Sequence, residues 1–197
     1  TRLMSGILSA QDFEVKITGD ESLSKRPMQR VITPLSLMGA KIESSGGTLP
    51  MKIYGNPGLK AVNYTSDKST AQVKSAVLFA GLYADGTTVY TEPVKSRDHS
   101  ERMLKAFGAE IEVKGNSVSV RPASKLNPQR ITVPGDISSA AFFIAAALMV
   151  PGSDLLIKNV NVNPTRDGIP DVFLLPGAAI KRANTRGCTG ARVCHTA

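Results

Sequence analysis

Three arginines of this chain have a sequence setting that suits the binding of anions. Arg26, Arg97 and Arg166 each come shortly before a stretch whose apolar residues have helical spacing. A guanidinium holds a phosphate or carboxylate through two parallel hydrogen bonds, and the start of a helix adds unpaired N–H groups. The alternative is that each arginine pairs with an acidic side chain of its own chain.

A second group of polar residues opens an otherwise apolar segment. Hydroxyls such as those of Ser69 and Thr70 usually cap a helix, whereas the amide of Gln72 needs partners that a ligand could supply. Lys74 is expected at the surface, and His99 is a weak signal alone. We find no serine–histidine–carboxylate triad and no glycine-rich phosphate loop in the sequence.

An internal repeat predicts the elements that carry these residues. The segment that begins at Gly39 recurs at Gly108 and at Gly177, a repeat period of 69 residues. Before each glycine we expect an amphipathic helix, and after it a short strand, at 41–43 and 110–114 in the first two copies. Each unit also has an apolar helix followed by a β-branched strand. We expect these helices at 3–8, 71–83 and 138–150, and the strands at 13–18, 87–90 and 155–157, with a further strand at 117–121.

This order predicts an α/β architecture built from repeated βαβαββ units. Proline and polar residues at 121–129 have the composition of a linker. We therefore assign residues 1–130 to a first domain with two repeat units and 131–180 to the first unit of a second domain. Residues 181–197 are expected to be an atypical basic tail that is disordered, or foreign to the fold, after Ala183. Pro176 interrupts the third amphipathic helix.

Composition narrows the classes of function. The 197 residues are 42% hydrophobic and contain no run of about 18 apolar residues, which excludes a membrane span. The net charge of +8 favours anionic partners such as phosphorylated metabolites or nucleic acid. Nucleic-acid binding is disfavoured because aromatic residues make up 5% of the chain and tryptophan is absent. Cys188 and Cys194 have no second cysteine pair beside them to make a zinc site, and two histidines cannot form a multi-histidine centre, so we expect no metal and no cofactor. Cysteine usage fits a cytoplasmic protein.

Several motifs together carry a resemblance to a known family. The segment 19–28 reads GDESLSKRPM and the segment 69–76 reads STAQVKSA. They resemble the GDxSLxxRPM and SAQVKSA motifs of the 5-enolpyruvylshikimate-3-phosphate synthases. Further matches are Glu92-Pro93, SRDHSE at 96–101, VPGDISSA at 133–140 and NPTR at 163–166. The resemblance covers about residues 1–180.

The resemblance implies transfer of the enolpyruvyl group of phosphoenolpyruvate to the 5-hydroxyl of shikimate 3-phosphate, with release of phosphate. This is a step of aromatic amino-acid biosynthesis in the shikimate pathway and the target of glyphosate. The implied fold is an inside-out α/β barrel of βαβαββ units, and proteins of this family are usually monomeric. By resemblance, Arg26 and Gln72 bind phosphoenolpyruvate. Thr70, Ala71, Gln72, Ser96 and Arg97 bind shikimate 3-phosphate, with Thr70 in place of the family's serine.

The resemblance also implies that this chain is an internal fragment. The family's catalytic lysine, aspartate and glutamate segments have no match in it, so we assign no catalytic residue and expect no turnover. One rival is the related enolpyruvyl transferase that acts on UDP-N-acetylglucosamine, which lacks the contexts around Arg26 and Arg97. The other rival is a non-catalytic module that binds anions or nucleic acid through its basic tail.

Overall fold

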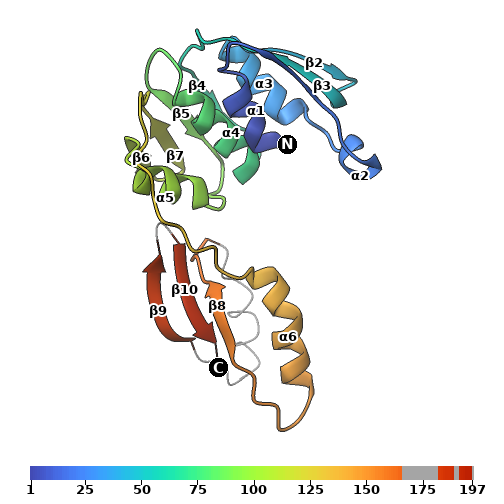
Figure 1. Cartoon of the computed structure of the whole chain (residues 1–197), viewed down its shortest axis with the longest axis vertical. Coiled ribbons are helices and arrows are strands. Elements are labelled where there is room, and N and C mark those ends of the chain that lie inside the picture. Colours follow the sequence, from blue (N-terminus) through green and yellow to red (C-terminus); the bar gives the residue numbers. More distant parts are fainter. Residues whose placement is uncertain (166–181, 189–190, 197) are drawn as a thin grey trace. The chain divides into compact units, whose positions relative to one another are not determined.

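The computed structural model describes residues 1–165 in full and the backbone of residues 182–188 and 191–196 (Figure 1). Contacts divide the chain into two compact units. One comprises Thr1–Ser96 with Gly108–Asn127, and the other comprises Arg97–Phe107 with the residues from Pro128 onward. Among the described residues, no helix has both the length and the apolar character needed to cross a bilayer.

The central repeat confirms the predicted βαβαββ order. Its strands are β4 (Asn63–Thr65), β5 (Thr88–Thr91), β6 (Ile111–Lys114) and β7 (Ser117–Val120), and its helices are α4 (Ala71–Gly81) and α5 (His99–Ala106). The four strands form one sheet in the order β4-β5-β7-β6. Parallel β4 and β5 are joined through α4, and β5, β7 and β6 are antiparallel neighbours.

The two flanking repeats use the same strand arrangement. The first contains α1 (Arg2–Leu8), β1 (Glu14–Ile17), α2 (Glu21–Ser24), α3 (Gln29–Leu37), β2 (Lys41–Ser45) and β3 (Thr48–Tyr54). The third contains α6 (Ile137–Met149), β8 (Ile157–Asn161), β9 (Arg182–Cys188) and β10 (Ala191–Thr196). Their sheets have the orders β1-β3-β2 and β8-β10-β9, which correspond to β5-β7-β6 (Figure 1). A parallel bridge between Gly135 and Val160 corresponds to the pairing of β4 with β5.

The prediction that residues after Ala183 lack regular structure is wrong. The backbones of β9 and β10 pair with each other, and β10 pairs with β8. Strand pairing uses main-chain N–H and C=O groups, so it does not require an alternating apolar pattern. Arg166, Pro176 and the glycine segment at 177–181 lie outside the described residues.

Two glycines end their helices as predicted. Gly39 and Gly108 follow α3 and α5 with φ of 93° and 87°, in the left-handed region that favours glycine. The strands β2 and β6 begin two and three residues later, so the repeated glycine sets the turn from helix to strand.

The core of the N-terminal unit surrounds α4. Val73, Ala76, Val77 and Ala80 are buried and belong to one cluster with Val31, Leu35 and Met38 from the α3 segment and Tyr90 from β5. Helix α1 also packs closely on α4, because a Cβ atom on Gly6 would lie 2.0 Å from the carbonyl oxygen of Ala76. Burial on several sides fixes α4 firmly, and its N-terminus carries the predicted binding residues.

Candidate functional site

The start of α4 presents polar groups that its helix does not use. Thr70 is the N-cap residue with extended backbone angles, yet its hydroxyl makes no capping hydrogen bond. The first N–H groups of an α-helix, here those of Ala71 and Gln72, have no acceptor within the helix. These donors, together with the positive end of the helix dipole, favour an anion at this place.

The side-chain amide of Gln72 forms a hydrogen bond with Arg2 of the same chain. The side chain is half-buried, and its Oε1 accepts a hydrogen bond of 2.5 Å from Nη1 of Arg2. The other terminal nitrogen of Arg2 donates to the carbonyl of Pro27 at 2.9 Å. Arg2 therefore joins the segment of Arg26 to the start of α4, a connection that the sequence analysis missed because 70 residues separate Arg2 from Gln72.

The described arginines lie where the repeat placed them. Arg26 is exposed in the connection between α2 and α3, three residues before α3 begins. Arg97 is exposed two residues before α5 begins. Both guanidinium groups are accessible to an anionic ligand, whereas Arg166 lies outside the described residues.

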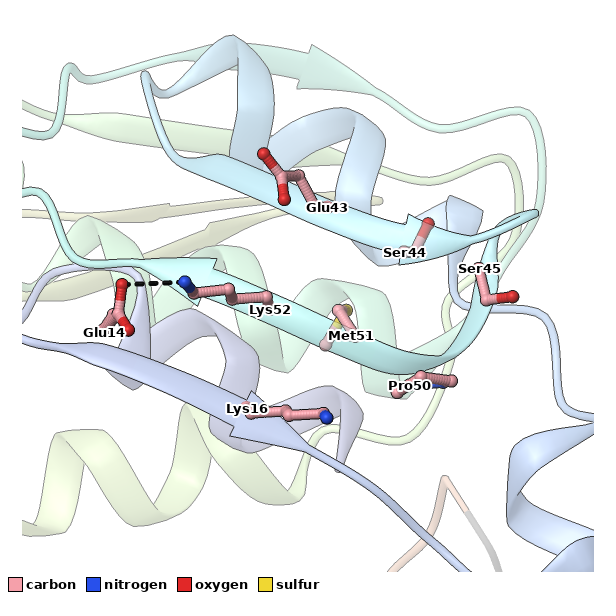
Figure 2. A pocket seen from close by; sticks show the side chains of 8 residues that line it. All are labelled: Glu14, Lys16, Glu43, Ser44, Ser45, Pro50, Met51 and Lys52. Carbon is pink, nitrogen blue, oxygen red and sulfur yellow. Dashed lines mark ion pairs between the residues drawn. The ribbon is translucent and has the colours of Figure 1, made fainter.

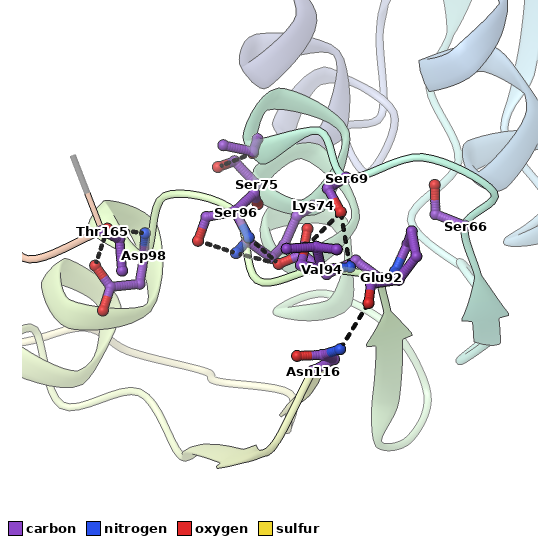
Figure 3. Close-up of polar contacts among 12 residues, drawn as sticks. Ser66, Ser69, Lys74, Ser75, Glu92, Val94, Ser96, Asp98, Asn116 and Thr165 are labelled. Carbon is purple, nitrogen blue, oxygen red and sulfur yellow. Dashed lines mark hydrogen bonds and ion pairs between the residues drawn. The ribbon is translucent and has the colours of Figure 1, made fainter. Parts of the chain in front are cut away.

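Lys74 is buried, which corrects the prediction that it lies at the surface. Its side chain and that of Glu92 are each 1% exposed, and Nζ lies 2.9 Å from Glu92 Oε1 (Figure 3). The sequence signal was present, because Lys74 stands one helical turn after Thr70 in an apolar helix and Glu92 directly follows β5. A buried lysine requires a charged partner, so these two positions imply each other.

The same pair reaches the backbone of Ser96. Glu92 Oε1 accepts from the N–H of Ser96 at 2.8 Å, and Lys74 Nζ lies 3.4 Å from the carbonyl oxygen of Ser96. A second brace comes from Ser69, whose hydroxyl donates to the carbonyl of Val94 and accepts from its N–H (Figure 3). The structure thus brings the Ser96 segment to the start of α4.

Asp98 lies at the centre of a polar cluster in the C-terminal unit. One carboxylate oxygen accepts from Asn163 at 2.7 Å and from Thr165 at 2.9 Å, and the other accepts from Arg102 at 2.9 Å. Burial acts to raise the pKa of Asp98, but these hydrogen bonds and the charge of Arg102 hold it below its usual value. The cluster explains why the motifs at 96–101 and 163–166 contain these residues.

Two of the hollows among the described residues lie in the N-terminal unit. The larger, of about 490 Å³, lies over the β1-β3-β2 sheet and contains none of the predicted binding residues (Figure 2). Lys52 forms an ion pair there with Glu14 at 2.9 Å, which neutralises its charge in part. The smaller, of about 150 Å³, includes Thr70 and Arg30 in its lining. Among residues 1–165, no group of three histidine, cysteine, aspartate or glutamate side chains could hold a metal ion.

Comparison with known proteins identifies the family. The family described as EPSP synthase (3-phosphoshikimate 1-carboxyvinyltransferase) matches residues 1–189. This chain belongs to the EPSP synthase family. Its fold is therefore the enolpyruvyl transferase-like arrangement of repeated βαβαββ units, present here in part.

Individual relatives agree with the EPSP synthase assignment. The 3-phosphoshikimate 1-carboxyvinyltransferase of Endomicrobium trichonymphae is 68% identical over 194 residues, which are 98% of this chain and 45% of that protein. That of Geotalea uraniireducens is 56% identical over 191 residues. A solved EPSP synthase from Acinetobacter baumannii has a TM-score of 0.90 and 46% identity, over 99% of this chain and 45% of that one.

These comparisons set the extent of the similarity. The chain spans a little less than half the length of the curated relatives it matches. The similarity also continues beyond residue 180, where the sequence analysis placed its end. The family match therefore includes residues 181–189 of the basic tail, where β9 lies.

Proposed function

We propose that this chain forms the shikimate 3-phosphate-binding part of a 3-phosphoshikimate 1-carboxyvinyltransferase. The complete reaction transfers the enolpyruvyl group of phosphoenolpyruvate to the 5-hydroxyl of shikimate 3-phosphate and releases inorganic phosphate. The observation that carries the proposal is the joining of the Ser96 segment to the start of α4, through Lys74 with Glu92 and through Ser69 with Val94.

The phosphate of the substrate would bind at the N-terminus of α4. The free hydroxyl of Thr70 and the N–H groups of Ala71 and Gln72 are suitable donors, and the helix dipole adds positive potential. Ser96 would add its hydroxyl, whose oxygen is buried and has no hydrogen-bond partner among the described residues. Arg97 would supply a full positive charge.

Phosphoenolpyruvate would bind to Arg26 and Gln72. The planar guanidinium of Arg26 can hold a carboxylate or phosphate in a bidentate manner. Arg2 supports this assignment, because it donates both to Gln72 and to the carbonyl of Pro27, the neighbour of Arg26. The two proposed substrate sites would then share Gln72.

Turnover requires a group that protonates the methylene carbon of phosphoenolpyruvate and a base that accepts the 5-hydroxyl proton. No described residue is assigned to either role, and the chain spans less than half the length of its relatives. We therefore propose that this chain binds substrate without turning it over. Phosphate release above background from the purified chain would contradict this.

Calorimetric titration with shikimate 3-phosphate, against shikimate as a control, tests the proposed site. Thr70→Val removes the hydroxyl but keeps the side-chain volume, and we expect the affinity for shikimate 3-phosphate to fall about tenfold or more. The matched control is Thr87→Val at an exposed position outside the site, which should bind like the wild type. Equal affinity of the wild type for shikimate and its 3-phosphate would refute the proposal.

A further inference from the structure

The buried pair of Lys74 and Glu92 has no role in the proposed chemistry. Both side chains are 1% exposed, so neither can touch a substrate without rearrangement. Lys74 lies two residues after Gln72 on α4, and Glu92 stands four residues before Ser96. The pair is therefore placed between the two segments that the proposed function assigns to shikimate 3-phosphate.

The pair contacts both backbone polar groups of one residue, Ser96. Glu92 Oε1 accepts from Lys74 Nζ at 2.9 Å and from the N–H of Ser96 at 2.8 Å (Figure 3). Lys74 Nζ is also 3.4 Å from the carbonyl oxygen of Ser96. Both backbone polar groups of Ser96 are thus held by one ion pair, while its hydroxyl oxygen has no hydrogen-bond partner among the described residues.

Stability alone does not account for this arrangement. Removing two charges from water is costly, and an apolar pair of similar volume is often at least as stabilising as a buried ion pair. Anchoring the segment does not require the charges either, because Ser69 already binds both backbone groups of Val94. What the ion pair adds is a defined orientation of the Ser96 peptide relative to the start of α4.

We propose that Glu92, held in place by Lys74, is a positioning residue for shikimate 3-phosphate. It orients Ser96 toward a phosphate bound at Thr70, Ala71 and Gln72. The role rests on the proposed function of this site. It explains why a lysine occupies the buried face of an apolar helix, where a leucine or methionine would pack without a partner.

Two charge-free double variants separate positioning from packing. K74M/E92Q keeps an oxygen that can accept from the N–H of Ser96, whereas K74M/E92L keeps similar volume without an acceptor. A surface pair provides the control K114M/E112L, since Lys114 and Glu112 form an ion pair 2.8 Å long with both side chains more than half exposed. Melting temperature, calorimetric affinity and amide hydrogen exchange are measured for each.

We expect the affinity for shikimate 3-phosphate to fall about tenfold or more in K74M/E92L and less in K74M/E92Q. The affinity for unphosphorylated shikimate should change less than twofold in both, and the control should match the wild type. The melting temperatures of the variants should not follow the order of their affinities for shikimate 3-phosphate. If the pair were purely structural, the variant with the weakest binding would also be the least stable.

The hydrogen-exchange rate of the Ser96 backbone amide tests the proposal without a ligand or a variant. In the wild-type chain its exchange should be at least about tenfold slower than that of the exposed neighbour Lys95, because only a bonded N–H is protected. Exchange as fast as that of Lys95 would overturn the proposal, as would wild-type affinity in K74M/E92L. Failure of the wild-type chain to bind shikimate 3-phosphate would instead refute the proposed function, and the positioning role with it.

Discussion

Replacing Gly6 with alanine should separate α1 from α4 and so disturb the start of the proposed site. A Cβ at this position would lie 2.0 Å from the carbonyl oxygen and 2.8 Å from the carbonyl carbon of Ala76. Real Cβ contacts are essentially never shorter than 3.0 Å, so the two backbones must move apart by about 1 Å. Backbone atoms cannot rotate away as a side chain can.

The magnitude follows from two opposing effects. Overpacking of this kind costs about 1–3 kcal/mol or more, whereas alanine in place of glycine within a helix gains about 1 kcal/mol. We expect the gain to reduce the cost without cancelling it, because the contact is with backbone on both sides. The net loss should be about 1–2 kcal/mol, a fall in melting temperature of roughly 2–8 °C for a chain of this size.

Thermal unfolding followed by circular dichroism measures the effect, and Met4→Ala on the exposed side of α1 is the control. Since α1 also carries Arg2, the shift should weaken the contact of Arg2 with Gln72 and reduce affinity for phosphoenolpyruvate. A Gly6→Ala chain as stable as the wild type or more so would refute the close packing of α1 on α4.

Two further predictions concern pH. The lowered pKa of Asp98 means that its ionised form stabilises the fold above about pH 4 and that this stability is lost as pH falls through the folded pKa. Asp98→Asn should therefore lower the free energy of unfolding by about 1–3 kcal/mol at pH 7. It should also weaken the dependence of that free energy on pH below about 4, as measured by urea unfolding. An unchanged dependence would contradict the cluster with Asn163 and Thr165. Burial raises the pKa of Tyr90 to about 12, so stability should fall by about 3 kcal/mol as pH rises from about 10 to about 12. Tyr90→Phe should lose less stability over that range, and equal losses in both chains would contradict the burial of the hydroxyl.

The repeat was the most informative feature of the sequence. The glycines at 39 and 108, each after a helix with an apolar stripe, predicted the helix ends and the strands that follow. Strand β3 escaped prediction because Pro50 interrupts its pattern, and β4 escaped because it has three residues. Strands β9 and β10 were missed because their sequences lack apolar alternation.

Single-residue environments were harder to predict than elements. The motifs predict Thr70, Ala71, Gln72 and Ser96 as binding residues, and the structure places them on segments that are joined by hydrogen bonds. The burial of Lys74 depends on Glu92, 18 residues further along the chain. Each residue adjoins an apolar element, but the pattern around either one alone does not show that the two side chains pair. Predicting long-range contacts of this kind requires the order of strands in the sheet, which cannot be derived from a single sequence.

The most direct test of the proposed site is nuclear magnetic resonance of the ¹⁵N-labelled chain during titration with shikimate 3-phosphate. The account predicts that the backbone amides of Ala71, Gln72, Ser96 and Arg97 shift together with one dissociation constant, and that shikimate without phosphate moves them far less. Shifts confined to the hollow lined by Lys16 and Lys52, or no shift at any amide, would contradict it.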